Sequence, residues 1–419
     1  MRRLRRTAFA LTLLAHCGAR SPLREGMNAP DDASSSDANA LDVRDVQATI
    51  DVATDAVPPD APAPCPELTL LAGPVIAFAT TRGSFATPRV VARAGGFDLF
   101  APLSNADMLG IRGRRMSLSG TPASITFGDV VVLGEDSWTW AEGGTDGTTL
   151  ALGYNSGGPT FRAWSGAYTS RTRVTLMIPG PVGTSAGVVW SGDRWFTGWN
   201  NDMGTSYVAE VSTDGRLLAV PRDSVVHLGR AAPSLAAYGN GAVWAAPEVG
   251  GGGIAVRFAP RGRPDVTRRI PVTGAAQSFR LSAWPADPTA AALVWRDAAG
   301  AVHLVVVRED GTLVVDRVAI VASSGTARAV EIAPFRDGVV LADVACGDRN
   351  PDNGLIGIHR FAADGLERGR GASVPLDCRG PLSLTSIAAG DDIAVAWLTP
   401  RPGPLGDRDV NAAVVRCSP

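Results

Sequence analysis

Cysteine is the residue type with the clearest potential for chemistry in this sequence, because its thiol can be acylated, oxidised to a disulfide or bound to a metal. One of the five cysteines, Cys17, lies close to the N-terminus. The other four are Cys65, Cys346, Cys378 and Cys417. Four cysteines allow three sets of pairings, and free buried thiols are the alternative. A zinc site is less favoured, because there is no C-x-x-C motif and the later histidines lie far apart, at His227, His303 and His359.

A loop with metal-like spacing follows Cys346. Asp348, Asn350 and Asp352 place side-chain oxygens at alternate positions, which is typical of a calcium-binding loop. The pattern is incomplete, because Asn353 occupies the position of the glycine that makes the sharp turn. His359 likewise occupies the position of the bidentate glutamate. Two interpretations stay open: a weak calcium site, and a polar hairpin loop next to Cys346.

The residues do not nominate a catalytic set. A nucleophilic serine needs a base held beside it, and general acid–base catalysis needs two carboxylates that converge on one cleft. The candidate side chains are instead scattered along the chain. The glycine run at Gly250–Gly253 lies in a connection between strands, not at a strand-to-helix turn, so it does not predict a phosphate-binding loop.

The composition predicts a folded, β-rich protein. The 419 residues are 45% hydrophobic and 19% charged with a net charge of −2, which excludes a disordered chain, a polytopic membrane protein and a strongly basic nucleic-acid binder. The 48 glycines and 30 prolines favour frequent turns over long helices. We expect no nucleic-acid partner.

The first 17 residues predict a signal peptide. The opening MRRLRR is followed by a short apolar run, residues 7–15, that is too brief for a membrane-spanning helix of about 20 residues. The segment Leu14-Ala15-His16-Cys17 resembles the bacterial lipobox, although His16 stands where a small residue is usual. The resemblance implies a lipid on Cys17 that anchors the protein to the cell envelope, at the outer membrane. A secreted or periplasmic protein is the alternative.

Residues 18–64 predict a disordered tether. They are rich in Asp, Ala, Ser and Pro with almost no aromatic residues, so they cannot bury enough surface to fold. Acidic residues greatly outnumber basic ones from Glu25 to Ala63, and their mutual repulsion should keep the segment extended. We therefore place the folded domain at residues 65–419.

The folded domain contains a repeat of about fifty residues. Its recurring turn glycines, at spacings of 53, 49, 47, 49 and 54 residues, are Gly113, Gly166, Gly215, Gly262, Gly311 and Gly365. Such spacing is typical of a repeat architecture. Asp-Gly turns between alternating apolar runs, as in HLVVVREDGTLVV, predict hairpins. Each unit reads as four strands, and seven units resemble an all-β, seven-bladed β-propeller of four-stranded antiparallel blades.

One strand of each unit is led by glycine or aspartate and ends near an aromatic residue. The series comprises GFDLF, DSWTW, DRWFTGW, GAVWAA, AALVW, GVVLAD and DIAVAW. Its comparable positions are Phe100, Trp140, Trp199, Trp244, Trp295 and Trp397, with Asp343 as the odd member. We expect these aromatic rings to fill the gaps between blades rather than to stack on a ligand. Trp195 and Trp199, followed by Asn200, Asn201 and Asp202, are the first place to look for an exception.

The last unit, which starts near Ser386, lacks its outer strand. The run Pro74–Thr80 precedes the first complete unit, so we infer that it supplies this strand and closes the ring. In that arrangement Cys65 and Cys417 flank adjacent strands and form a disulfide. Cys346 and Cys378 then pair across two loops at one end of the sixth blade.

Acidic residues should gather on the face that carries the loops between second and third strands. They are Asp107, Glu142, Asp146, Asp202, Glu248, Asp297, Asp407 and Asp409. This face is either a solvated surface or a partner site. We expect it to be the binding surface, because loops on rigid scaffolds carry function.

The architecture resembles tethered bacterial envelope lipoproteins with a propeller domain, although no family-specific propeller motif is present. The Asp-box motif of sialidases is matched only in part, at Ser191–Trp195. A rigid ring with variable loops suits recognition, and no catalytic group stands out. We therefore expect a monomeric, non-enzymatic binding or scaffold module without a cofactor, whose protein or glycan partner binds the loop face. The alternative is a propeller enzyme, a hydrolase or lyase, that acts on glycans.

Mass spectrometry of the mature N-terminus tests the anchor. We expect a diacylated Cys17 as the first residue, and the variant Cys17→Ala should move the protein from the membrane to the soluble fraction. A free N-terminus at or beyond Gly18 would leave only the secreted form.

Overall fold

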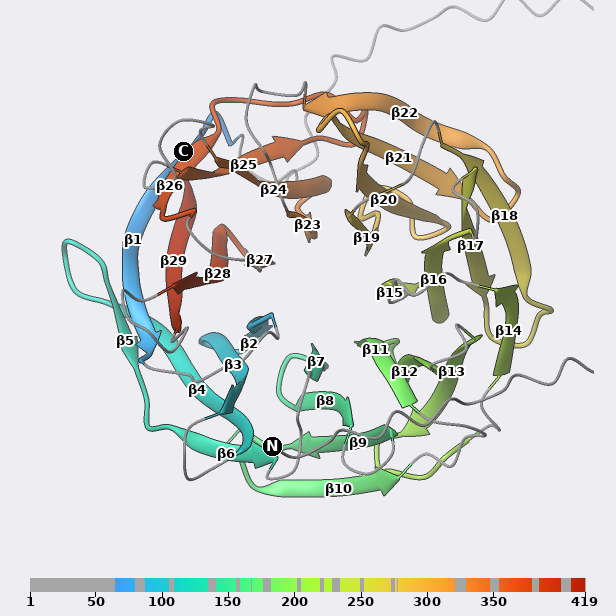
Figure 1. The fold of residues 1–419 in the computed structure, drawn as a ribbon, viewed down its shortest axis with the longest axis horizontal. Coiled ribbons are helices and arrows are strands. Elements are labelled where there is room, and N and C mark those ends of the chain that lie inside the picture. Colours follow the sequence, from blue (N-terminus) through green and yellow to red (C-terminus); the bar gives the residue numbers. More distant parts are fainter. Residues whose placement is uncertain are drawn as a thin grey trace, which may run out of the picture. The chain divides into compact units, whose positions relative to one another are not determined.

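The computed structural model describes residues 65–79, 87–104, 109–134, 141–155, 159–166, 168–175, 182–201, 205–218, 222–227, 234–248, 252–272, 276, 278–320, 329–346, 354–378, 384–400 and 408–418. The predicted signal peptide, Cys17 and tether lie outside these ranges. The described residues form seven antiparallel sheets arranged as blades in a ring (Figure 1). They include no helix long and apolar enough to cross a membrane. The predicted seven-bladed β-propeller is therefore confirmed.

The strands of the first four blades run in chain order from the centre of the ring outward. Blade 1 comprises β2 (Arg89–Arg93), β3 (Gly96–Ser104), β4 (Leu109–Ser119), β5 (Ser124–Phe127) and β6 (Val131–Gly134). Blade 2 comprises β7 (Ala141–Thr145), β8 (Leu150–Asn155), β9 (Pro159–Trp164) and β10 (Ser170–Thr175). Blade 3 comprises β11 (Val182–Trp190), β12 (Arg194–Asn201), β13 (Thr205–Ser212) and β14 (Arg222–His227). Blade 4 comprises β15 (Ser234–Tyr238), β16 (Gly241–Pro247), β17 (Gly253–Ala259) and β18 (Val266–Pro271).

The remaining three blades complete the ring. Blade 5 comprises β19 (Ser278–Ala283), β20 (Ala290–Arg296), β21 (Val302–Arg308) and β22 (Leu313–Ile320). Blade 6 comprises β23 (Val330–Phe335), β24 (Gly338–Cys346), β25 (Gly354–Phe361) and β26 (Ala372–Leu376). Blade 7 comprises β27 (Leu384–Ala389), β28 (Asp392–Pro400), β29 (Arg408–Ser418) and β1 (Glu67–Phe78). Each innermost strand contacts the innermost strand of the next blade.

The ring closes as predicted, because β1 is the outer strand of blade 7. It pairs with β29 in an antiparallel register that runs from Glu67 opposite Ser418 to Phe78 opposite Val410. The strand begins earlier than the predicted Pro74–Thr80 run, and Thr80 lies outside the described residues. Both predicted disulfides are present: Cys65–Cys417, with 5.5 Å between Cα atoms, and Cys346–Cys378, with 5.9 Å.

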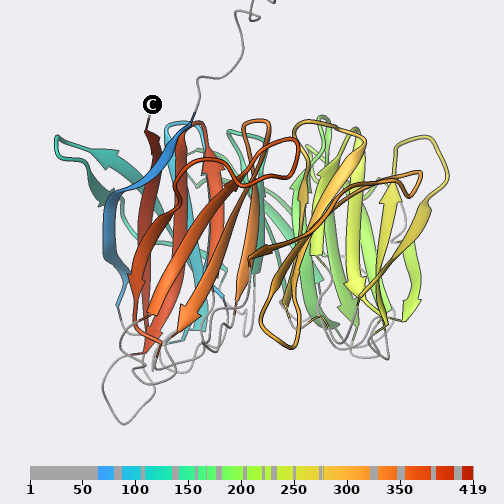
Figure 2. The ribbon, with the colours of Figure 1, turned by 90° about the horizontal axis from the view of Figure 1, so that it is seen from above.

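The ring has two distinct ends, which Figure 2 shows from the side. At the end that we call the hairpin end, short turns join the first strand of a blade to its second, as at residues 94–95, 239–240, 336–337 and 390–391. At the opposite end, which we call the loop end, the second strands connect to the third strands. Many of those connections lie outside the described residues.

Two parts of the repeat prediction are wrong in the first two blades. Gly113 lies within β4, and the outer turn of blade 1 is at Gly120 instead. The apolar run before DSWTW is β6, which pairs with β4 as an outer strand of blade 1. An outer strand exposes alternate side chains, and here Val132 is 51% exposed while Leu133 is buried. Hydrophobicity alone does not tell such an outer strand from an inner one.

The second strand of blade 2 is consequently β8, not DSWTW, and Trp140 lies outside the described residues. The corresponding aromatic residue is Tyr154, which pairs with Ala141 of the innermost strand. Phe100 also differs from the series, because it packs with Leu150 and Leu152 of the following blade.

The other aromatic residues of the series fill the gaps between blades, as predicted. Trp199 packs with residues of blade 2, Trp295 with residues of blade 4 and Trp397 with residues of blade 6. Trp195 and Trp199 are each 2% exposed, so neither indole offers a stacking surface. The core is thus a set of layers between blades, each closed by large side chains.

Removal of each disulfide should destabilise the propeller to a different extent. The Cys65→Ala/Cys417→Ala variant opens a link across 352 residues, and the chain-entropy model predicts a loss of roughly 6 kcal/mol in the free energy of unfolding. The matched Cys346→Ala/Cys378→Ala variant opens a link across 32 residues and should lose about 3–4 kcal/mol. Denaturant unfolding measures both, and a non-reducing peptide map that joins Cys65 to Cys346 would contradict the pairing.

Candidate functional site

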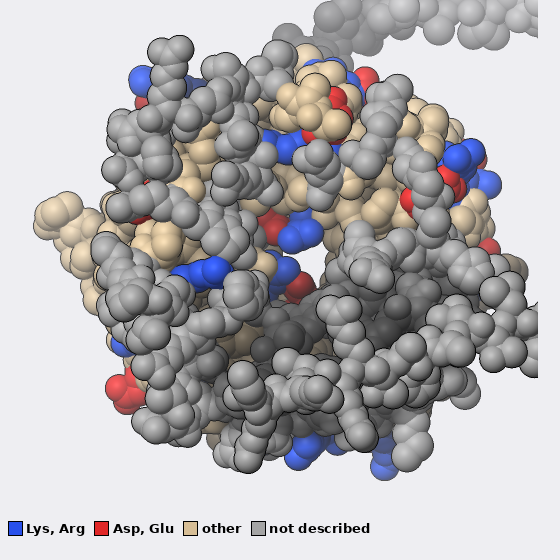
Figure 3. Space-filling model, in the orientation of Figure 1, with Lys and Arg blue, Asp and Glu red and all other residues tan. Residues whose placement is uncertain are grey.

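Charged side chains of both signs line the central channel near the loop end (Figure 3). They come from the innermost strands of four blades. Arg89 Nε lies 2.6 Å from Glu142 Oε2, Arg89 Nη1 lies 3.9 Å from Glu331 Oε1, and Arg280 Nε lies 2.7 Å from the same Glu331 oxygen. Burial raises the pKa of Glu331, although Arg280 and Arg89 oppose that shift. Each carboxylate therefore has a guanidinium partner.

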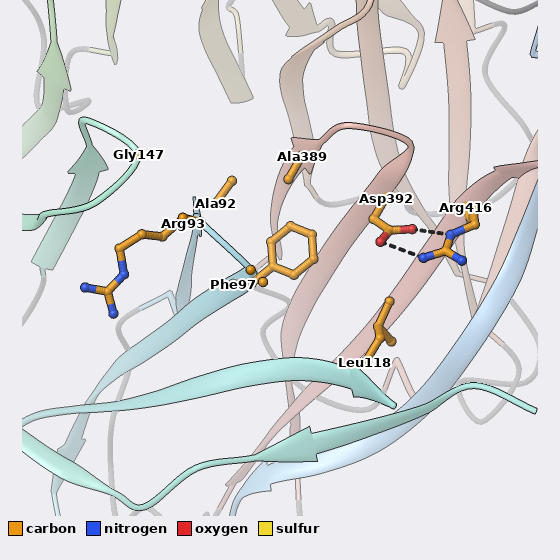
Figure 4. Close-up of a pocket in the computed structure, with 11 residues that line it drawn as sticks. Ala92, Arg93, Phe97, Leu118, Gly147, Ala389, Asp392 and Arg416 are labelled. Carbon is orange, nitrogen blue, oxygen red and sulfur yellow. Dashed lines mark hydrogen bonds and ion pairs between the residues drawn. The ribbon is translucent and has the colours of Figure 1, made fainter. Parts of the chain in front are cut away.

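A pocket of about 480 Å³ opens at the hairpin end, between blades 7 and 1 (Figure 4). Its lining residues are Ala92, Arg93, Ala94, Gly95, Gly96, Phe97, Leu118, Gly147, Ala389, Asp392 and Arg416. On one side of the pocket Arg416 donates to both oxygens of Asp392, from Nε at 2.6 Å and from Nη2 at 2.9 Å. These hydrogen bonds raise the pKa of Arg416. The pocket thus combines small apolar groups with one fixed ion pair.

A buried polar cluster lies on the opposite side of this pocket. Asp98, which is fully buried, accepts at Oδ1 from Arg93 Nη2 at 3.1 Å and from Arg115 Nη1 at 3.2 Å. Arg93 Nε lies 2.6 Å from the other oxygen, Oδ2, as an ion pair. The hydroxyl of Tyr168 in blade 2 donates to Asp98 at 2.7 Å, and burial raises the pKa of that tyrosine. Arg93 also donates to the backbone oxygens of Thr148 and Ser165. These bonds link blade 1 to blade 2 and compensate the charge of Arg93.

A second cavity of about 520 Å³ lies between blade 6 and the segment that precedes β1. Its carboxylates are also paired: Asp337 accepts from Arg360 at 3.1 Å, and Asp364 accepts from Arg368. Neither of these two cavities brings together two carboxylates, or a carboxylate and a histidine, that are free to exchange a proton with a ligand.

Asp343 and His359 form a polar chain between blades 5 and 6. Asp343 takes the place of an interblade aromatic residue, as the sequence series indicated. The buried Arg296 of blade 5 occupies the space that the aromatic ring would fill, and its Nη2 lies 3.7 Å from Asp343 Oδ2. His359 Nε2 lies 3.3 Å from Asp343 Oδ1, and its Nδ1 lies 2.8 Å from Glu367 Oε1. The sequence marked Asp343 as unusual but did not identify Arg296 or Glu367.

The predicted calcium residues Asp348, Asn350 and Asp352 lie outside the described residues. Within the described ranges, no group of three or more His, Cys, Asp or Glu side chains could hold a metal ion. His359, which was assigned to the calcium pattern, is instead bonded to two carboxylates.

The predicted acidic face is only partly described, because Asp107, Asp202 and Asp407 lie outside the described residues. Asp146 was assigned to the wrong end, since it lies in the turn between β7 and β8 at the hairpin end and caps Thr148 and Thr149. This error follows from the wrong strand assignment in blade 2. The other described members are Glu142 at the channel, Glu248 paired with Arg269, Asp297 paired with His303, and the buried Asp409.

Sequence reasoning did not identify the pocket residues Ala389, Asp392 and Arg416. The leading Asp392 of DIAVAW was no distinguishing signal, because DSWTW and DRWFTGW in the same series are also led by aspartate. The other members of the site come from different blades, and no spacing in the sequence brings them together.

No protein-family model and no curated protein matches the chain. Among solved structures, the BP39L lectin from Burkholderia pseudomallei is similar, with a TM-score of 0.54, 11% identity, and coverage of 80% of this chain and 97% of that one. AofleA from Arthrobotrys oligospora is also matched, with a TM-score of 0.44, 10% identity, and coverage of 72% and 90%. At this identity the likeness to BP39L supports the propeller fold alone.

The polar chain around His359 predicts a pH-dependent stability. Burial lowers the pKa of His359, but the hydrogen bonds to Asp343 and Glu367 outweigh burial and raise the pKa above its usual value of 6.5. The stabilisation is therefore complete below about pH 6.5 and is lost as pH rises through the raised pKa. Denaturant unfolding across this range should show that loss, and His359→Gln should remove it. An unchanged pH profile in His359→Gln would contradict the assignment.

Proposed function

We propose that this protein is a non-enzymatic binding module for carbohydrate, held at the cell envelope by a lipid on Cys17. The observation that carries the proposal is the pocket between blades 7 and 1, which lies at the hairpin end and not on the loop face that the sequence favoured. Its volume of about 480 Å³ lies within the range of small-molecule sites, about 300–1,000 Å³. It joins apolar groups to one ion pair, which is the combination that a sugar ring with hydroxyl groups requires.

Two further observations support binding over catalysis. The carboxylates of the two described cavities are each paired with arginine, so neither cavity offers the acid and base that glycoside cleavage uses. The propeller ring also has a precedent for carbohydrate binding, because the similar BP39L protein is a lectin. A scaffold of this kind presents a ligand site without moving parts.

A glycan array tests the proposed function. The full chain, labelled away from the pocket, should be retained by a defined set of glycans and released by an excess of the free sugar. Incubation of the retained glycans with the protein should leave their chain length unchanged. An array with no retained glycan would contradict the proposal, and shortened glycans would favour the enzyme alternative.

A further inference from the structure

The pocket exists because one hairpin departs from the pattern of three others. Blades 1, 4, 6 and 7 each join their first two strands through a two-residue turn, so the residues that flank the turns are equivalent. The residue before the turn is large and buried in three of these blades, at Arg93, Tyr238 and Phe335. In blade 7 it is Ala389, which is much smaller.

The large residues fill the gap to the following blade. Tyr238 belongs to the apolar cluster that blades 4 and 5 share, and its hydroxyl donates to Glu309 of blade 5 at 2.8 Å. Phe335 belongs in the same way to the apolar cluster that blades 6 and 7 share. Ala389 also faces the following blade, since it packs against the cluster shared by blades 7 and 1. Its small side chain leaves open the space that a tyrosine or phenylalanine occupies elsewhere.

The residue after the turn also departs from the pattern. It is glycine in the other three blades, Gly96, Gly241 and Gly338, where an added Cβ would approach a backbone oxygen of the third strand to within 2.5, 2.1 and 2.0 Å. Blade 7 has Asp392 at this place, and its carboxylate faces Arg416 of β29 (Figure 4). The blade 7 hairpin thus has a small residue, Ala389, where the others have a packing side chain, and a charged residue, Asp392, where they have glycine. Such local departures from a repeat are expected where a fold carries function.

The chemistry of the pocket favours a neutral ligand. Asp392 is paired with Arg416, and Asp98 is shared by Arg93 and Arg115, so both guanidinium groups that line the pocket already face a carboxylate. A ligand carboxylate or phosphate would have to compete with these partners. Much of the remaining lining consists of small or apolar residues, which suit the C–H face of a sugar ring.

The ion pair keeps unused hydrogen-bonding capacity. A carboxylate has about four acceptor sites and a guanidinium has five donors, and the Asp392–Arg416 pair uses two of each. The side chains are 21% and 44% exposed, respectively. Two adjacent hydroxyl groups can each donate to the carboxylate and accept from the guanidinium, whereas a single hydroxyl can engage only part of the pair.

We infer that the pocket between blades 7 and 1 binds one neutral sugar residue through two adjacent hydroxyl groups, which the Asp392–Arg416 pair recognises. The inference rests on the proposed carbohydrate-binding function and assigns it to a site. Ala389 provides the space, and the wall held by Arg93 and Asp98 keeps the pocket open.

Calorimetric titration of the full chain tests this site. The probes are the methyl glycosides of glucose, galactose and mannose, the deoxy analogue of the one that binds best, and methyl glucuronide as a charged probe. We expect at least one neutral glycoside to bind, and its deoxy analogue and the glucuronide to bind about tenfold more weakly or worse. Stronger binding of the glucuronide would overturn the inference.

Two variants locate the binding. Ala389→Tyr introduces the side chain of the equivalent Tyr238, so it should fill the pocket without loss of thermal stability and weaken the glycoside about tenfold or more. Asp392→Asn keeps the size of the side chain and should also weaken binding, which provides a second measurement if the first variant misfolds. Ala298→Tyr adds the same ring at an exposed position of the β20–β21 turn and is the matched control, with unchanged affinity.

The outcomes separate the site from the function. Full glycoside affinity in both Ala389→Tyr and Asp392→Asn would overturn the site and leave carbohydrate binding intact. If the array retains glycans but no neutral methyl glycoside binds in solution, the site is likewise overturned and carbohydrate binding is kept. A wild-type protein that binds no glycan on the array and no glycoside in solution would overturn both.

Discussion

The antiparallel pairing of β1 with β29 is the constraint on which the rest of the propeller depends. It joins residues separated by almost the whole described chain, from Glu67 opposite Ser418 to Phe78 opposite Val410. Without it β29 would be an unpaired edge and the layer between blades 7 and 1 would be open at its rim. The Cys65–Cys417 disulfide fixes the same junction, and Arg114 of blade 1 adds a hydrogen bond to the backbone oxygen of Ala77 in β1 at 2.6 Å.

Given a closed ring, the layers between blades decide its rigidity. Most layers are apolar and end in a large ring such as Trp199 or Trp397. The layer between blades 5 and 6 is different, because Asp343 and Arg296 replace that ring with a buried ion pair. Buried charges are costly unless they are paired, so the partners of Asp343, including His359, are part of how this layer is held together.

Departures from the repeat also explain where the pocket lies. Closure places blade 7, built from both ends of the folded domain, beside blade 1, and the Ala389 hairpin then faces a neighbour without a side chain to fill the gap. Asp392 and Arg416 can be presented at this gap because they sit on paired strands of one blade. A repeat fold can in this way acquire a single site by changing two residues of one hairpin, while its other blades keep their packing.

The sequence by itself determined the fold class, the number of blades, the strand that closes the ring and both disulfides, because turn glycines and short alternating strands are local signals that recur about every fifty residues. It was wrong in blades 1 and 2, because the apolar run β6 is an outer strand of blade 1, whereas the innermost strand of blade 2, β7, has the weakly apolar sequence AEGGT. Only the tertiary structure decided the charged set at the channel, the partner of Asp343 and the pocket between blades 7 and 1. The channel set and the pocket join residues such as Arg89 and Glu331, or Ala92 and Arg416, whose closeness results from ring closure. Asp343 and Arg296 meet because neighbouring blades pack face to face, and none of these contacts leaves a spacing in the sequence.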